Sequence, residues 1–301
     1  MASGEQARLF GVLGDPVDHS LSPAMHNAAF AAVGLPHLYL RYRVPTRALR
    51  SAMREARTLR MGGLNLTVPL KEAVLPFLDG VTPEAERIGA VNTIVFRPDE
   101  RLVGENTDGR GFLRALRGRV TLRGAAVVIL GAGGSARAVG VALAAAGAAR
   151  VTIANRTRVR GEALAERLTR ASAAEIVAVP IEAVGRGDAL TDAMLVVNTT
   201  PLGLAGAALR VRYAATPRGC TFVDLVYGAR PTPFLAGATR AGRRTLDGSM
   251  MLLHQGALAF EAWTGRRAPR AAMARALANA GLPLTRHRPP ATVRAPRPPT
   301  R

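Results

Sequence analysis

A glycine-rich turn between an apolar run and an alanine-rich segment constrains the fold of this chain most strongly. The run at 125–130 is followed by Gly131, Gly133 and Ala136, in the spacing G-x-G-x-x-A. The first glycine permits a tight turn, the second lets the backbone approach a pyrophosphate, and the small third residue lets helix and strand pack closely. A phosphate would then lie at the helix N-terminus. The context on both sides predicts a Rossmann-type dinucleotide-binding unit, with a purely structural glycine turn as the alternative.

The end of the next apolar segment, 150–155, indicates which dinucleotide fits. A site for NAD usually has an acidic residue there, which accepts a hydrogen bond from the ribose 2′-hydroxyl. This chain instead has Asn155, Arg156 and Thr157, with Arg160 one turn further on. A guanidinium suits a 2′-phosphate, and no carboxylate is present to repel it. NADP is therefore favoured, although Arg156 could also be an ordinary surface arginine.

Strand-like and helix-like segments alternate along both halves of the chain, which predicts an α/β fold with a mostly parallel sheet. A length of 301 residues suits about two domains. We expect helices that begin near 22, 46, 249 and 270, a hairpin within 91–106, and terminal helices that pack back on the first domain. The predicted division is a substrate-binding domain (1–115 plus 248–282), a Rossmann NADP-binding domain (116–247) and a disordered basic Pro/Arg tail (283–301).

The formal net charge of +20 raises the possibility of nucleic-acid binding. The segment 283–301 carries five of the arginines and no acid, and the arginines of 41–60 are interpreted as solvated faces of a strand and a helix. Only 4% of residues are aromatic, which is few for the stacking platforms that bases require. No nucleic-acid partner is expected.

Cysteine usage and hydropathy indicate the compartment. The only cysteine, Cys220, is expected to be buried and suits a reducing environment. The first residues lack the pattern of a signal peptide, and no apolar run is long enough to span a bilayer. We therefore expect a cytoplasmic protein without a membrane partner, either a monomer or a homodimer.

One lysine stands out among the basic residues. Of the 41 lysines and arginines, only Lys71 is a lysine. Arginine holds a charge but does not readily release a proton, because its pKa exceeds about 12. Lysine can release one when its site is desolvated. Position 71 is therefore a candidate for a proton-transferring cation.

Two serines precede a predicted helix and form a candidate anion site. Ser20 and Ser22 place hydroxyl groups beside the free N–H groups of a helix N-terminus, which suits a carboxylate or a phosphate. Ser22 could instead simply cap its helix. The histidines 19, 26 and 254 lack the spacing of metal ligands, and no metal site is expected.

Ordered motifs along 9–281 resemble the shikimate dehydrogenase family. They are the two serines, Asn65-x-Thr67-x-Pro69-x-Lys71, the segments 89–93, 106–109, 131–137, 155–157, 198–203 and 224–227, and Asp247-Gly248 followed by Gln255. Members of this family reduce 3-dehydroshikimate to shikimate with NADPH, in aromatic amino-acid biosynthesis. The tail after about 283 has no counterpart in the family pattern.

The resemblance implies a role for each matching residue. Lys71 and Asp108 match the catalytic pair, and Ser20 and Ser22 would hold the substrate carboxylate. Contacts to the ring hydroxyls and carbonyl would come from Asn65, Thr67, Asn92, Asp108, Tyr227 and Gln255. Pyrophosphate contacts would come from Gly131, Ala132, Gly133, Gly134 and Ser135, 2′-phosphate contacts from Asn155, Arg156, Thr157 and Arg160, and the nicotinamide lining from Leu225 and Gly248.

Several alternatives remain open at the level of sequence. Asp108 could merely cap its helix, Tyr227 could be a core aromatic, and Gln255 could be a surface residue. A quinate/shikimate dehydrogenase of the same family, perhaps using NAD, is the nearest rival function. A non-catalytic relative that binds metabolites or nucleic acid is a more distant one.

Overall fold

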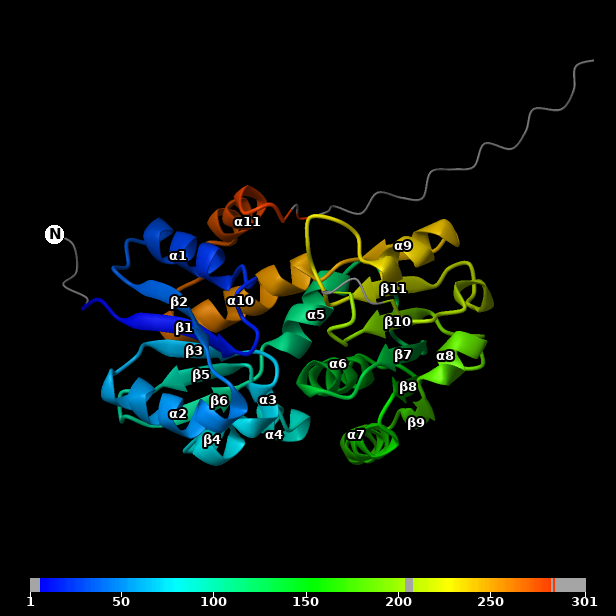
Figure 1. The fold of residues 1–301 in the computed structure, drawn as a ribbon, viewed down its shortest axis with the longest axis horizontal. Coiled ribbons are helices and arrows are strands. Elements are labelled where there is room, and N and C mark those ends of the chain that lie inside the picture. Colours follow the sequence, from blue (N-terminus) through cyan, green and yellow to red (C-terminus); the bar gives the residue numbers. More distant parts are fainter. Residues whose placement is uncertain (1–5, 204–207, 283, 285–301) are drawn as a thin grey trace, which may run out of the picture.

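The computed structural model describes residues 6–203, 208–282 and 284. It contains two six-stranded sheets that lie side by side, each covered by helices (Figure 1). The predicted α/β fold with two domains is confirmed. The predicted tail, 283–301, lies outside the described residues except for Leu284.

The first sheet has the strand order β2-β1-β3-β5-β6-β4. Strands β1, β2 and β3 are parallel, β5 runs antiparallel to both β3 and β6, and β4 is parallel to β6. The antiparallel β5–β6 pair is the predicted hairpin, so this sheet is mixed, with three of its five pairings parallel. The strands are β1 (Leu9–Gly14), β2 (Leu38–Arg43), β3 (Gly63–Leu66), β4 (Gly80–Val81), β5 (Thr93–Phe96) and β6 (Leu102–Glu105).

The second sheet is parallel throughout, with the order β12-β11-β10-β7-β8-β9. When β7 to β12 are numbered 1 to 6 and the sheet is followed from the β9 edge, the order is 3-2-1-4-5-6. This is the order of a doubly wound Rossmann sheet. The order reverses between β7 and β10, so the crevice for a dinucleotide lies at their carboxyl ends. The strands are β7 (Ala126–Leu130), β8 (Arg150–Asn155), β9 (Glu175–Pro180), β10 (Leu195–Asn198), β11 (Thr221–Asp224) and β12 (Arg244–Leu246).

Helices connect the strands in both halves. Those of the first half are α1 (Ser22–Ala32), α2 (Leu49–Thr58), α3 (Leu70–Ala73), α4 (Pro83–Ile88) and α5 (Asp108–Leu116), with short 3₁₀ turns η1 (Thr46–Ala48) and η2 (Leu75–Phe77). The helix expected from position 46 thus starts as a 3₁₀ turn. The others are α6 (Gly134–Ala145), α7 (Arg158–Ala171), α8 (Glu182–Arg186), α9 (Pro233–Arg240), α10 (Ser249–Thr264) and α11 (Arg270–Asn279), with the 3₁₀ turn η3 (Tyr213–Ala215).

The last two helices return to the first half of the chain, as predicted. Helix α10 packs against α5 and β5, and α11 packs against α1 (Figure 1). The indole N–H of Trp263, on α10, donates a hydrogen bond to the carbonyl of Ile94, with 3.0 Å between nitrogen and oxygen. The core on this side therefore contains residues from both ends of the sequence, among them Phe10, Phe30 and Phe260.

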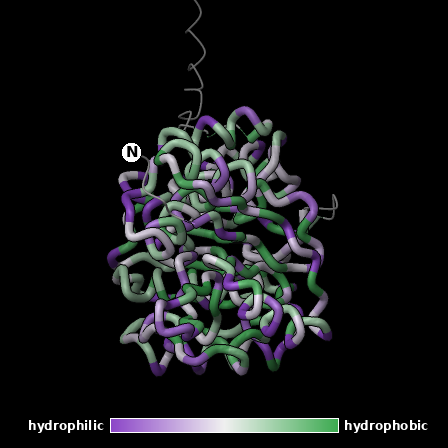
Figure 2. The backbone as a smooth tube through the Cα atoms, turned by 90° about the vertical axis from the view of Figure 1, so that its left-hand side faces the viewer, coloured by the Kyte–Doolittle hydropathy of each residue, from purple (hydrophilic) through white to green (hydrophobic). Residues whose placement is uncertain are grey.

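In the view of Figure 2, hydrophobic segments lie mostly toward the centre of the molecule, and hydrophilic segments are frequent at its edges. Cys220 is fully buried, as predicted, and burial raises the pKa of its thiol to about 12. Among the described residues, no helix has the length and apolar character that crossing a membrane requires.

His26 is an unusual member of the first core. Its side chain is completely buried, and its ring stacks on that of Tyr39 with 4.5 Å between centroids. Neither ring nitrogen has a hydrogen-bond partner within the described part of the chain. Burial lowers the pKa of His26 from 6.5 to about 3, so the folded protein keeps this imidazole neutral.

This burial predicts a dependence of stability on pH. The folded pKa lies below the unfolded value, so the stabilisation is present above about pH 6.5 and is lost progressively as the pH falls from there toward the folded pKa of about 3. Between about pH 7 and pH 5, His26 should cost about 2 kcal/mol of unfolding free energy. Urea unfolding of the wild type and of His26→Leu at both pH values would measure it. The same pH sensitivity in both proteins would contradict the prediction.

Candidate active site

A pocket of about 180 Å³ lies between the two halves of the molecule. All nine residues predicted as catalytic or substrate-binding line it: Ser20, Ser22, Asn65, Thr67, Lys71, Asn92, Asp108, Tyr227 and Gln255. Three predicted cofactor residues, Ser135, Leu225 and Gly248, line it as well. Positions more than two hundred residues apart in the sequence are thus brought together in one cleft.

An ion pair joins the two predicted catalytic residues. The Lys71 ammonium lies 2.6 Å from Oδ2 of Asp108, and the side chains are only 13% and 6% exposed. Lys71 also donates to Oγ of Ser135, at 3.0 Å. Helix α3 carries the lysine and α5 begins at the aspartate, so the pair links two elements of the first half and contacts the second.

Asn92 fixes the orientation of the Asp108 carboxylate. The backbone N–H of Thr107 donates to Oδ1 of Asn92 at 2.8 Å, which identifies that atom as the oxygen. The Nδ2 group of Asn92 therefore donates to Oδ1 of Asp108, at 2.7 Å. Oδ2 of Asp108 remains for Lys71.

Asp108 is not merely a helix cap. It is the first residue of α5, and Thr107 occupies the N-cap position. Its carboxylate serves Lys71 and Asn92, while the side chain of Asn106 accepts a hydrogen bond from the Asp108 N–H, at 3.0 Å. The amide of Asn106 in turn donates to the carbonyl of Ala90, at 2.8 Å.

The serine pair differs from the simplest expectation. Ser22 is the first residue of α1 rather than its N-cap, and Leu21 at the N-cap position makes no side-chain capping bond. Oγ of Ser20 instead accepts a bond from the Ser22 N–H, at 3.3 Å. Both serines are nearly buried and line the pocket.

Arg41 supports this end of the pocket, which the sequence interpretation did not anticipate. All seven arginines of 41–60 are exposed, as expected, and the guanidinium of Arg41 in addition donates two hydrogen bonds to the Ser20 carbonyl, at 2.8 and 2.6 Å. Arg41 lies on β2, where apolar and polar residues alternate, and this pattern does not predict a contact with Ser20. A positive charge beside the two serines favours an anionic ligand group.

Tyr227 and Gln255 also face the pocket, so neither is only a core or surface residue. Burial raises the pKa of Tyr227 above its usual value, against the opposing effect of hydrogen bonds with Leu21 and Ser20. The carbonyl oxygen of the Gln255 side chain accepts from Nδ2 of Asn92, at 3.4 Å, and its amide donates to the carbonyl of Leu252. The raised pKa keeps the Tyr227 hydroxyl protonated, and the Gln255 amide carries no charge.

The glycine turn after β7 has the shape that a pyrophosphate requires. Gly131 has φ +109°, and a Cβ there would lie 2.7 Å from Oγ1 of Thr199. A Cβ on Gly133 would meet no atom of the described residues within 4 Å, so open space lies above the N-terminus of α6. A Cβ on Gly134 would lie 2.9 Å from Cβ of Lys71, so the absence of a side chain there lets the turn approach Lys71 closely.

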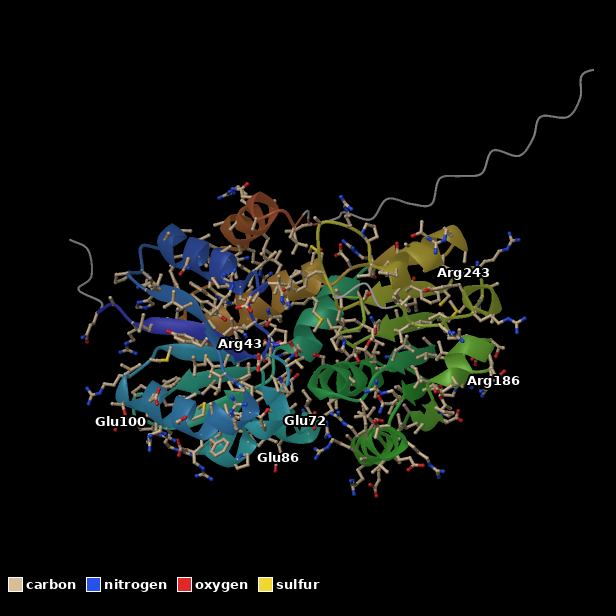
Figure 3. All side chains as sticks on the ribbon, in the orientation of Figure 1. Arg43, Glu72, Glu86, Glu100, Arg186 and Arg243 are labelled. Carbon is tan, nitrogen blue, oxygen red and sulfur yellow. The ribbon has the colours of Figure 1, made fainter. Side chains whose placement is uncertain are left out.

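The remaining predicted cofactor residues lie outside the pocket, at the end of β8. Asn155 donates to the Thr157 carbonyl at 2.8 Å, and the exposed Arg156 lies between them. Arg160 forms an ion pair with Glu72, at 3.6 Å, and Arg137 forms a closer one with the same carboxylate, at 3.0 Å. Figure 3 labels Glu72 where the two halves meet. The described end of β8 carries no acidic side chain, which fits NADP.

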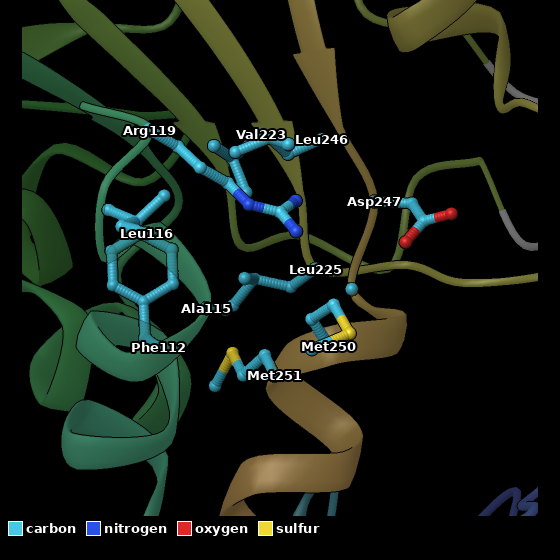
Figure 4. A pocket seen from close by; sticks show the side chains of 11 residues that line it. Phe112, Ala115, Leu116, Arg119, Val223, Leu225, Leu246, Asp247, Met250 and Met251 are labelled. Carbon is cyan, nitrogen blue, oxygen red and sulfur yellow. The ribbon is translucent and has the colours of Figure 1, made fainter. Parts of the chain in front are cut away.

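A second, much smaller pocket adjoins the first (Figure 4). It lies between α5, the strands β11 and β12, and the start of α10, and Arg119 points into it. Its volume of about 10 Å³ holds at most one water molecule. It shares Leu225, Gly248 and Met251 with the larger pocket. No cluster of potential metal ligands occurs within the described part of the chain.

A Rossmann sheet whose glycine turn meets a buried Lys–Asp pair defines a dinucleotide-dependent oxidoreductase. Three family models match the chain: the shikimate dehydrogenase substrate binding domain over 12–94, shikimate/quinate 5-dehydrogenase over 115–200, and the shikimate 5'-dehydrogenase C-terminal domain over 248–278. The chain belongs to the shikimate dehydrogenase family.

Individual relatives agree with this assignment. The shikimate dehydrogenase (NADP(+)) of Symbiobacterium thermophilum is 48% identical over 269 residues, which cover 87% of this chain and 90% of the relative. The structure of shikimate 5-dehydrogenase from Thermus thermophilus in complex with NADP(H) and shikimate is 43% identical, with a TM-score of 0.78 and coverage of 91% and 99%. Quinate dehydrogenase from Corynebacterium glutamicum in complex with NAD is 34% identical, with a TM-score of 0.80 and the same coverage.

The glycine turn offers a matched pair of variants. Gly133→Ala places a methyl group in open space, so we expect it to leave stability unchanged and to weaken NADP⁺ binding by about tenfold, since the methyl group takes the place of a phosphate contact. Gly131→Ala should destabilise the fold, because of its positive φ and its contact with Thr199. Thermal unfolding and calorimetric titration with NADP⁺ separate the two effects. Unchanged affinity in Gly133→Ala would place the pyrophosphate elsewhere.

Proposed function

We propose that this protein catalyses the reversible NADPH-dependent reduction of 3-dehydroshikimate to shikimate, a step toward chorismate and the aromatic amino acids. The observation that carries the proposal is the single cleft in which the Lys71–Asp108 pair faces the two serines and adjoins the glycine turn. A small polyhydroxylated carboxylate matches this combination of a cation, neutral amides and hydroxyls.

Ser20 and Ser22 bind the substrate carboxylate in this proposal, supported by the charge of Arg41. Asn65, Thr67, Asn92, Tyr227 and Gln255 contact the ring hydroxyls and the carbonyl. Their support is that all of them line the same pocket as the ion pair.

Lys71 handles the proton of the reaction. A carbonyl oxygen that gains a hydride on its carbon becomes an alkoxide, which an ammonium both stabilises and protonates. Asp108 holds the ammonium in place through the 2.6 Å ion pair, and Asn92 holds Asp108. In the reverse direction, neutral Lys71 accepts the proton of the hydroxyl.

NADP is the cofactor that we assign to the second half. When bound, its nicotinamide supplies or accepts the hydride. Gly131, Ala132, Gly133, Gly134 and Ser135 would hold the pyrophosphate, and Asn155, Arg156, Thr157 and Arg160 the 2′-phosphate. Leu225 and Gly248, which line the pocket, would adjoin the nicotinamide.

The division into a substrate-binding domain (1–115 plus 248–282) and an NADP-binding domain (116–247) is part of the proposal. It is supported by the two separate sheets and by the packing of α10 and α11 on the first. We further propose that the protein acts in the cytoplasm, which its single cysteine supports, and that it is a monomer or a homodimer.

A matrix of two substrates and two cofactors tests the proposed reaction. Purified protein is incubated with shikimate or quinate, each with NADP⁺ or NAD⁺, and absorbance of the reduced cofactor is followed. We expect shikimate with NADP⁺ to give the highest kcat/KM, since the described end of β8 offers arginines and no carboxylate. A higher value for quinate with NAD⁺ would assign the protein to the quinate branch of the family.

Lys71→Arg tests the role of the only lysine. The variant should fold and bind NADP⁺ with wild-type affinity, yet its kcat should fall at least about 100-fold, because arginine does not transfer protons near neutral pH. Stopped-flow or steady-state turnover measures kcat, and Arg87→Lys provides a control in which the exchange lies on α4, outside the pocket. Turnover near the wild-type rate in Lys71→Arg would refute the assignment.

A further inference from the structure

Tyr39 lies beneath the pocket without lining it. It belongs to β2, its side chain is completely buried, and its hydroxyl is 2.8 Å from Oδ1 of Asn65. Burial raises the pKa of Tyr39 well above the ordinary value, an effect opposed by a hydrogen bond with Ser22. The hydroxyl therefore keeps its proton and can act as a donor.

The hydrogen bonds of Asn65 fix the direction of its amide. Its Nδ2 group donates to the backbone carbonyl of Asn92 and to Oγ1 of Thr93, both at 3.1 Å. A carbonyl oxygen can only accept, so the nitrogen must face Asn92. Both amide protons are then used, and Oδ1 must face Tyr39, which donates to it.

Asn65 consequently has one hydrogen-bonding capacity left for the pocket. An amide oxygen accepts two hydrogen bonds, and Tyr39 uses one of them. Asn65 therefore offers a ligand only a hydrogen-bond acceptor, Oδ1. The ligand has to present a donor there, such as a hydroxyl group. A ligand carbonyl or carboxylate oxygen would find no proton there.

We propose that Tyr39 is a positioning residue for substrate specificity: it holds Oδ1 of Asn65 as a hydrogen-bond acceptor for one ring hydroxyl of the substrate. This inference rests on the proposed function, since it takes Asn65 as a substrate contact. It adds the direction of that hydrogen bond, in which Asn65 accepts and the substrate donates. It also identifies Tyr39 as the buried group that fixes this direction.

The same proton directions continue to the catalytic pair. Thr93 receives a proton from Asn65 and donates its own to Oδ1 of Asn92, at 2.9 Å. Asn92 then donates to Asp108, at 2.7 Å. From Tyr39 through Asn65, Thr93 and Asn92, each side chain thus donates a hydrogen bond to the next one. The series ends at the Asp108 carboxylate, which only accepts.

Tyr39→Phe removes the hydroxyl with little change in shape. We expect KM for shikimate to rise about fivefold, as for one weakened hydrogen bond, with kcat within about twofold of the wild type and an unchanged KM for NADP⁺. Tyr42→Phe is the matched control. Tyr42 lies on the same strand, is partly exposed, and its hydroxyl makes no hydrogen bond with any other described residue.

Substrate analogues separate positioning from a general structural effect. Two analogues of shikimate each lack one of the two ring hydroxyls that are not oxidised, and their inhibition constants are measured with both proteins. In the wild type, the loss of one hydroxyl should weaken binding more than in Tyr39→Phe, because the variant no longer holds its acceptor. Equal losses in both proteins for both analogues, or an unchanged KM, would overturn the proposal.

A further measurement keeps the proposal testable if Tyr39→Phe folds poorly. Hydrogen exchange of the Asn65 side-chain amide in the wild type, observed by nuclear magnetic resonance, should be slow for both protons, and fast exchange of either would overturn the assigned direction. Wild-type turnover of shikimate with NADP⁺ is a separate result. If that turnover were missing, the proposed function would fail while the amide direction could still be correct.

Discussion

The buried ion pair between Lys71 and Asp108 is the interaction on which the architecture of the site depends. Removing two charges from water is costly, and the attraction between them compensates only when the geometry is good and the remaining polar atoms are satisfied. The free oxygen of Asp108 receives the amide of Asn92, and the ammonium donates also to Ser135. Asp108 further begins α5, where the helix dipole stabilises a negative charge. The network is therefore a condition for keeping both charges in the cleft.

The same pair explains why the second half of the molecule lies so close to the first. Helix α6 begins at Gly134, whose missing side chain leaves room for Lys71, and Ser135 next to it accepts from the ammonium. Glu72, which is labelled in Figure 3, follows Lys71 in the sequence and forms an ion pair with Arg137 of α6. On the neighbouring helix α7, Arg167 donates to the carbonyls of Glu86 and Arg87 at the end of α4. Lys71 and the glycine turn are thus positioned by one continuous set of contacts.

Much of this could be predicted from the sequence, because the strong signals are local. The glycine turn, the alternation of strands and helices, and the hairpin depend on neighbours in the chain, and each was found where expected. The grouping of the nine pocket residues followed from the family resemblance rather than from any local pattern. Strand β4, with two residues, is too short to carry a periodic signal. Capping of the helix by Ser22 was one alternative, but the helix begins at Ser22 itself, and the side chain of Ser20 accepts a hydrogen bond from the Ser22 N–H.

The contacts that sequence reasoning missed are those between residues far apart in the chain. Arg41 is exposed, as expected, but only the fold brings its guanidinium to the Ser20 carbonyl. From the sequence, Tyr39 is an ordinary core residue of an alternating strand. The hydrogen bond of its hydroxyl with Asn65, on another strand, depends on the fold.

The value of lysine at position 71 follows from this geometry together with its chemistry. Its Nζ reaches Asp108 and Ser135 at 2.6 and 3.0 Å, with α6 packed against its side-chain stem. A compact ammonium makes both contacts from one atom and leaves a third N–H direction toward the pocket. A planar guanidinium would spread its donors over a longer fork, and its proton would stay bound. Elsewhere on the chain, where arginine meets carboxylates and carbonyls at the surface, neither limitation matters. The composition of the whole chain therefore singles out the position at which, in the proposed reaction, a positive charge also releases a proton.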